Sequence, residues 1–207
     1  MTDGYNGQRG NFTGGSQLNA TAFLIRQIIA GKAFAAVVTV KRVTNNGGIT
    51  PAGVVAVQPM VNQIDGRGNQ LPHGTIYNLP YFRLQGGANA VIIDPAVGDI
   101  GLSVICDRDI SSVKATRAVS GPGSRRQNSH ADGLYIGGFL NGTPTQFVAF
   151  SATGILMSSP NSVTITAPAV QINSTVTVSG DVIAQGTHLH THIHPDPQGG
   201  VTGAPIG

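Results

Sequence analysis

A series of very short apolar pairs, repeated at nearly constant spacing, constrains the fold of this chain more than any other feature. The pairs start seven, six and six residues apart, and they are Val163/Ile165, Val170/Ile172, Val176/Val178 and Val182/Ala184. Small polar residues, glycine or proline separate them, and Asp181 is the only charged residue between positions 147 and 186. Each pair predicts a strand too short to bury its own apolar face, so the burial has to come from stacking.

We interpret residues 147–186 as a shaft of the β-helix or β-prism type. These forty residues are few for a solenoid built from one chain. Three identical chains wound around a common axis would enclose a core of valine and isoleucine, and they would also remove free strand edges. The sequence therefore predicts a homotrimer with an intertwined β-helix shaft.

The first 32 residues predict an arm followed by one short helix. Residues 1–16 are rich in glycine and asparagine, which is typical of a flexible arm. Apolar residues then recur at helical spacing from about Asn19, and Gly31 supplies a stop signal. The apolar residues with this spacing are Leu18, Ala22, Ile25, Ile28 and Ile29.

Residues 33–118 predict a small β domain, which makes the chain mainly β. Strands are expected at Ala35–Val43, Gly53–Gln58, Tyr77–Leu84, Asn89–Ile93 and Ile100–Asp107. Several short strands around one core, in fewer than ninety residues, suit a barrel of the oligosaccharide/oligonucleotide-binding (OB) type. Residues 119–146 predict a connection to the shaft, with one short strand at Leu134–Leu140.

Charge and cysteine content argue against several functions. The 12 lysines and arginines all lie at or before Arg126 and are scattered, and only 5% of residues are aromatic, so the pI near 9.4 indicates solvated surface charge rather than a nucleic-acid partner. The first residues lack the pattern of a secretory signal, which predicts synthesis in the cytoplasm. The single cysteine, Cys106, lies in a predicted strand, and we expect it to be a buried thiol rather than a nucleophile.

Four of the six histidines alternate with other residues near the C-terminus, at His188, His190, His192 and His194. In an extended chain, all four imidazoles would project from one face. On a three-fold axis, one His-x-His pair per chain would deliver six nitrogens, which suits an octahedral site and favours iron, with nickel as an alternative. Protein ligands would fill such a site completely, so the ion would be structural. Residues 187–207 therefore predict a metal-binding tip, with a narrow cap of little regular structure after the histidines.

No constellation of catalytic residues is found in the sequence. There is no glutamate, and no Gly-x-Ser-x-Gly, Walker loop or Cys-x-x-Cys is present. We interpret Asp107 and Asp109 as structural, whereas Arg125 and Arg126 either grip an acidic surface of a partner or lie exposed in the connection. The prediction is a protein that is not an enzyme and has no small-molecule substrate.

The chain resembles the central spike family of contractile phage baseplates, which are membrane-piercing spikes related to the baseplate assembly protein V group. Within residues 54–118 the resemblance lies in the segments Val57–Gln63, Asn78–Gly87, Ile93–Gly101 and Asp107–Lys114. At the C-terminus it lies in a His-x-His followed by Gly-Gly-x-Thr-Gly-x-Pro. With the repeats between these parts, the resemblance covers nearly the whole chain.

The resemblance implies a homotrimer with an OB barrel as collar, a β-helical shaft, and one iron per trimer at the apex, held by two histidines of each chain. His192 and His194 match the ligand pair best, because Pro195–Gly200 follows them directly. His188 and His190 are additional to the usual single pair, so they are second candidates, and a second metal layer is conceivable.

The implied function is mechanical piercing of the bacterial outer membrane from the tip of a virion's tail or a related injection machine. The protein would be made in the host cytoplasm, and its arm and helix would contact the tube or the baseplate hub. The rival interpretation is a trimeric receptor-binding fibre or adhesin, which predicts an aromatic sugar-binding surface. Residues 147–207 contain phenylalanine only at Phe147 and Phe150, and neither tyrosine nor tryptophan.

Overall fold

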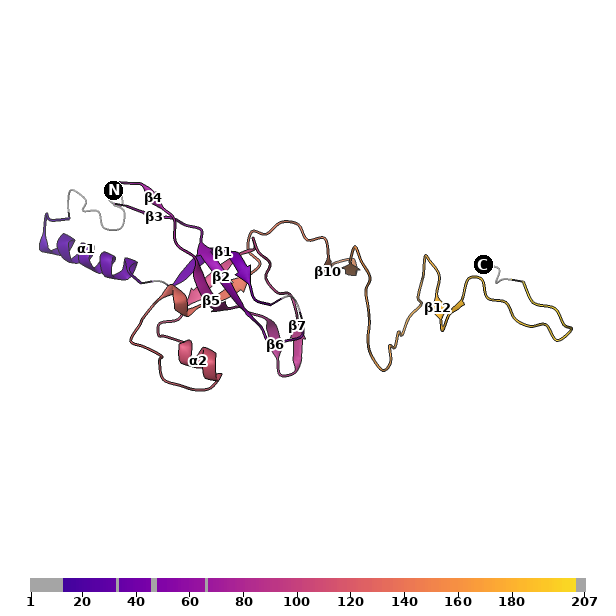
Figure 1. The fold of residues 1–207 in the computed structure, drawn as a ribbon. Coiled ribbons are helices and arrows are strands. Elements are labelled where there is room, and N and C mark those ends of the chain that lie inside the picture. The colour runs from indigo at the N-terminus through magenta and orange to yellow at the C-terminus, as the bar shows by residue number, and fades with distance from the viewer. Residues whose placement is uncertain (1–12, 33, 46–47, 66, 204–207) are drawn as a thin grey trace. The chain divides into compact units, whose positions relative to one another are not determined.

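The computed structural model describes residues 13–32, 34–45, 48–65 and 67–203, and the chain divides into two compact units. The first unit is Met1–Thr143 and the second is Pro144–Gly207 (Figure 1). Only residues 13–16 of the predicted arm lie within the described ranges. Among the described residues, no helix combines the length and the apolar character needed to cross a lipid bilayer.

Helix α1, Gln17–Ala30, confirms the predicted helix and begins two residues earlier than expected. It begins there because the Ser16 side chain accepts a hydrogen bond from the backbone N–H of Asn19 at 3.2 Å, which caps the first turn. It ends at Gly31, whose N–H donates to the carbonyl of Gln27 at 3.1 Å. Sequence signals at both ends therefore set the length of the helix.

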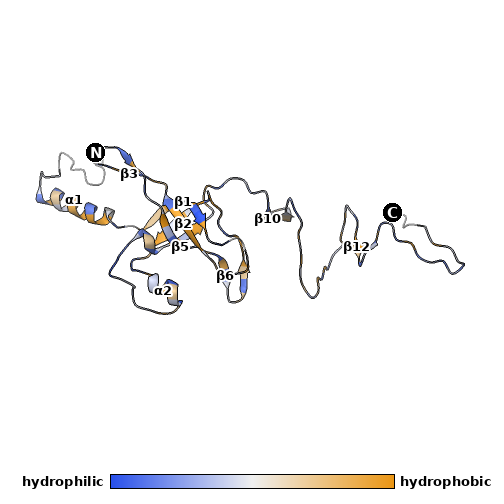
Figure 2. Cartoon of the chain, in the orientation of Figure 1, coloured by the Kyte–Doolittle hydropathy of each residue, from blue (hydrophilic) through white to orange (hydrophobic). Residues whose placement is uncertain are grey.

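The core of the first unit is a five-stranded antiparallel sheet that curls into a half-barrel. The strand order is β5-β2-β1-β8-β9, with β1 Ala35–Val43, β2 Val54–Pro59, β5 Ile76–Pro80, β8 Ile100–Ile105 and β9 Gly133–Gly137. Alternate residues point inward, and these strands carry much of the hydrophobic colour in Figure 2. The buried cluster consists of Val38, Val40, Val55, Val57, Leu79, Tyr81 and Tyr135.

The two ends of the curled sheet approach each other at a pair of tyrosines. Tyr81, which follows β5, forms a parallel bridge with Tyr135 of β9. The backbone N–H of Phe82 donates to the carbonyl of Tyr135 at 2.8 Å. A bulge between Val40 and Arg42 in the β1–β2 pairing is the kind of irregularity that lets a strand bend around a core.

Two small hairpins, one short helix and one 3-10 turn lie outside the five-stranded sheet. They are the hairpin of β3 Gln63–Ile64 and β4 Gln70–Leu71, the hairpin of β6 Leu84–Gly86 and β7 Asn89–Val91, helix α2 Ser111–Thr116, and a 3-10 turn at His130–Asp132. The strand expected at Tyr77–Leu84 is therefore divided between β5 and β6.

The connection predicted at 119–146 differs most from the structure. Its strand is β9, which pairs with β8 along its whole length and places Tyr135 in the core with no exposed surface. The sheet thus extends 19 residues past the predicted boundary at 118, to Gly137. Nothing in the local apolar pattern of this strand could show which sheet it joins, because pairing is decided by packing.

The named strands of the second unit form two short hairpins within the described residues 144–203. They are β10 Phe147–Ser151 with β11 Gly154–Ser158, and β12 Ile183–Ala184 with β13 Thr187–His188. Residues 159–182, all described, form no strand within one chain. The valines and isoleucines of the four repeated pairs are between 41% and 70% exposed. None of the described residues 144–203 is buried, so this unit has no core of its own.

Candidate metal-binding tip

The histidine run does not form the single extended face that its alternation predicts. His188 ends the β12–β13 hairpin, whose two-residue turn has positive φ at both Gln185 (51°) and Gly186 (84°), as a type I′ turn requires. The chain then turns back, and the N–H of His192 donates to the carbonyl of His188 at 2.9 Å. The prediction of one face was wrong for the single chain, where residues 189–193 have no partner strand to keep them extended.

His192 and His194 lie next to each other, and the centroids of their rings are 4.9 Å apart with an interplanar angle of 88°. The Nδ1 atom of His192 lies 2.8 Å from the carbonyl oxygen of Leu189. Because a carbonyl can only accept, Nδ1 must carry the proton, and the lone pair is on Nε2. Histidine ligands of metals are commonly oriented in this way by a second hydrogen bond, so His192 is prepared to bind an ion through Nε2.

The backbone of His194 is held by a second hairpin. Its N–H donates to the hydroxyl of Thr202 at 2.9 Å, and the N–H of Thr202 donates back to the carbonyl of His194 at 2.9 Å. Pro195 and Val201 form an antiparallel bridge between these bonds and the turn. The expected cap therefore has little regular structure among the described residues, namely this bridge and its turn, with pairing as far as Thr202.

The turn of this hairpin explains the sequence Asp-Pro-Gln-Gly. The N–H of Gly199 donates to the carbonyl of Asp196 at 3.0 Å, and the carboxylate of Asp196 accepts from the N–H of Gln198 at 3.0 Å. Pro197 suits the second position of such a turn, and Gly199 has a φ of 88°, which a residue with a Cβ adopts at a cost. These residues thus specify the reversal that follows the His192/His194 pair.

His188 has a different partner. Its Nδ1 lies 2.5 Å from a carboxylate oxygen of Asp181, the residue that was the only charge of the predicted shaft. The other oxygen of Asp181 accepts from the backbone N–H of His190 at 3.1 Å. The hydrogen bond with His188 is the main cause that lowers the pKa of Asp181 below its ordinary value. His188 and His190 therefore share Asp181 as a partner, whereas the partner of the His192 ring is the carbonyl of Leu189.

One chain supplies an incomplete metal site. Within the described ranges, no three His, Cys, Asp or Glu side chains gather in a way that could hold an ion. The His192/His194 pair offers two imidazoles, and ions that prefer imidazole need four to six ligands. The described part of one chain therefore brings together too few ligands for a complete site.

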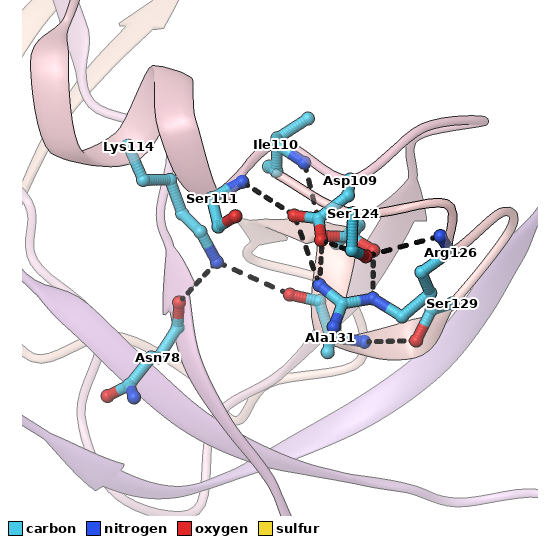
Figure 3. A network of polar contacts seen from close by, with 10 residues as sticks. Asn78, Asp109, Ile110, Ser111, Lys114, Ser124, Arg126, Ser129 and Ala131 are labelled. Carbon is cyan, nitrogen blue, oxygen red and sulfur yellow. Dashed lines mark hydrogen bonds and ion pairs between the residues drawn. The ribbon is translucent and has the colours of Figure 1, made fainter. Parts of the chain in front are cut away.

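A cluster of polar contacts in the first unit holds the segment predicted as a connection, residues 119–146, against the folded domain (Figure 3). The Nε of Arg126 donates to Asp132 at 2.7 Å and its Nη2 donates to the same carboxylate at 2.9 Å, while Nη2 also lies 3.2 Å from Asp109. The side chains of Asp132 and Asp109 are 0% and 4% exposed. Arg126 is exposed in the connection, as one of the two interpretations has it, with its side chain 41% exposed, and it also neutralises two buried carboxylates, which neither interpretation included.

Hydrogen bonds complete this cluster. The Ser124 hydroxyl donates to Asp109 at 2.6 Å, and the backbone N–H of Ile110 donates to Asp132 at 3.2 Å. The bond from Ser124 is the main cause that lowers the pKa of Asp109, and the bond from Arg126 is the main cause for Asp132. Sequence reasoning missed the cluster because its members approach only after the chain has folded around α2.

Comparison of the chain with models of known protein families finds no match. A search of curated protein sequences likewise finds no significant similarity. The function is therefore inferred from the residues and their geometry.

Proposed function

We propose that this chain is the central spike of a contractile phage tail or a related injection machine, where it pierces the bacterial outer membrane as a homotrimer. The observation that carries the proposal is the second unit, in which none of the described residues 144–203 is buried although apolar pairs recur through it. A segment with this composition gains stability only by covering those pairs, and further copies of the same chain offer the matching surface.

Burial between chains would supply a driving force for assembly. Fully covering one valine or isoleucine side chain stabilises by about 1.5–3 kcal/mol. The repeated pairs contain seven such side chains, each now at least 41% exposed. Covering them between chains removes this apolar surface from water, and three chains around one axis also leave no free strand edge.

We propose an OB-type barrel as the collar of the spike. Support comes from the strand order β5-β2-β1-β8-β9 and from the parallel bridge between Tyr81 and Tyr135 that joins its two ends. A five-stranded, partly open barrel with a parallel closing pair is the architecture of that class. The collar would dock on the tail tube or the baseplate hub.

At the tip, we propose that His192 and His194 of three chains hold one structural transition metal ion, with iron preferred. The orientation of His192, with its Nε2 left free by the bond to Leu189, fits this role. When bound, the ion supplies a fixed junction between three chain ends, which stiffens the point that receives the force of sheath contraction. Six imidazole ligands leave no open position, so the proposed protein is mechanical and not an enzyme.

Elemental analysis of the purified protein tests the proposal together with light scattering. Wild type, purified without chelator, is expected to be a trimer with about one transition metal ion per three chains. The double variant His192→Ala/His194→Ala should remain a trimer and lose the ion, because the shaft and not the ion drives assembly. The matched control, His188→Ala/His190→Ala, should keep it. A monomeric wild type would overturn the spike, and a metal-free wild type would overturn the tip.

A further inference from the structure

Helix α1 leaves an apolar stripe uncovered within one chain. Leu18, Ile25 and Ile29 are 77%, 50% and 57% exposed. Arg26 is the only charged residue among the 14 of the helix. An isolated helix of this length is marginal in water, so its stability in the assembled protein needs a partner for the stripe.

The spacing of the stripe indicates what that partner is. Leu18, Ala22, Ile25 and Ile29 follow one another at steps of four, three and four residues, which are the d, a, d and a positions of a heptad repeat. Isoleucine occupies both kinds of position, at Ile25 and Ile29. Isoleucine at a and d shifts the preference of a coiled coil from two strands to three or four.

We propose that the α1 helices of three copies form a short parallel bundle along the axis of the trimer. The inference rests on the proposed trimer for the number three, while a separate part of the chain indicates more than two strands. Three-fold symmetry makes the helices parallel and brings identical residues together. Two heptads associate weakly on their own, and the trimeric shaft would raise their effective concentration into the range where they pair.

A rival occupant of the stripe is the outer face of the sheet in a neighbouring copy. There Val37, Leu102 and Ile136 lie side by side in register on β1, β8 and β9. The two arrangements differ in which residues meet. The bundle brings Ile25 against Ile25 of the other copies, whereas packing on the sheet keeps the three Ile25 residues apart.

Disulfide formation in the full-length chain distinguishes the helix bundle from packing of the helix on a neighbouring sheet. Cys106, the only native cysteine, is first replaced by serine, and Ile25→Cys is then compared with Ala20→Cys on the opposite side of the helix. Mild oxidation of the Ile25→Cys trimer should link up to about two-thirds of the chains as dimers, because one disulfide joins two of three thiols. Ala20→Cys should give several-fold less, and Ile29→Cys repeats the test at a second core position.

Light scattering of each variant separates failure of this inference from failure of the proposed function. A trimer that fails to link at both Ile25→Cys and Ile29→Cys overturns the bundle and leaves the proposed spike intact. Equal linking at Ile25→Cys and Ala20→Cys reports random collision and also overturns the bundle. A monomer overturns the proposed spike, and the bundle with it.

Discussion

The same type of apolar residue, valine, is buried in the core of the first unit of the chain and exposed in the second. In the first unit, Val38 and Val57 are fully buried, whereas in the second Val163 and Val176 are 55% and 58% exposed. The difference lies in strand length. Strand β1 has nine residues and β2 has six, enough for each to place several side chains on one face, whereas the repeats of the second unit offer pairs.

An alternating apolar pattern therefore forms a core only when the strands that carry it can close around their apolar side chains. The first unit closes through the Tyr81–Tyr135 bridge around a buried cluster of its own. In the proposed spike the second unit obtains its stability from other copies, so its folding would depend on protein concentration. The predictions below test this contrast, from the largest expected effect to the smallest.

Truncation tests whether the first unit is independent and where it ends. A fragment ending at Thr143 should fold, with β-type circular dichroism and a cooperative thermal transition, because it contains all five strands of the sheet. A fragment ending at Ala118 should be unfolded, since it lacks β9 and with it Tyr135. A cooperative transition in the shorter fragment would mean that β9 is dispensable.

A charge in the middle of the proposed shaft tests the dependence of the second unit on other copies. Val176→Asp should abolish the trimer, because three unpaired carboxylates near the axis cost several kcal/mol each. Thr177→Asp is the matched control, and it should assemble because alternate residues of a strand face opposite sides. Both variants should keep the thermal transition of the first unit. Normal trimer yield from Val176→Asp would place Val176 toward solvent.

Tyr135 tests the core of the first unit. Tyr135→Ala should lower the free energy of unfolding of this unit by about 3–5 kcal/mol, as expected for removing a fully buried aromatic ring. Burial also raises the pKa of Tyr135 to about 12, and among the described residues its hydroxyl has no hydrogen-bond partner. Tyr135→Phe should therefore be neutral or slightly stabilising. Urea titration of the fragment ending at Thr143 measures both, and a large loss from Tyr135→Phe would reveal a partner for the hydroxyl.

Acid should weaken the first unit through the Arg126 cluster. The pKa values of Asp109 and Asp132 are lowered in the folded state, so their ionised forms add stability above the unfolded value of about 3.9. This contribution is lost as the pH falls through the folded-state pKa values. The Tm should be steady from about pH 7 to 5 and should fall below about pH 4.

Arg126→Ala should lower the Tm near neutral pH and make its decrease in acid shallower, because the pKa of Asp132 then rises. Arg125→Ala, the adjacent exposed arginine, should leave the profile unchanged. Identical pH profiles for the two variants would show that the cluster does not control acid stability.

The sequence by itself determined the elements whose signals are local. Ser16 and Gly31 mark the ends of α1, and the predicted strand at Ala35–Val43 coincides with β1. The mainly β character follows from composition, whereas the short strands predicted at Val163/Ile165, Val170/Ile172 and Val176/Val178 do not form within one chain. Capping, turn chemistry and periodicity act within a few residues, so they can be recognised without the rest of the fold.

Only the tertiary structure decided what distant residues do together. It placed β9 in the sheet, set Arg126 between Asp109 and Asp132, and paired His188 with Asp181. Local pattern could not give these results, since the partner of a strand, a charge or an imidazole is chosen by packing and desolvation over the whole unit. A strand of period two stays extended only where a neighbouring strand pairs with it, and for residues 189–193 one chain supplies no such neighbour.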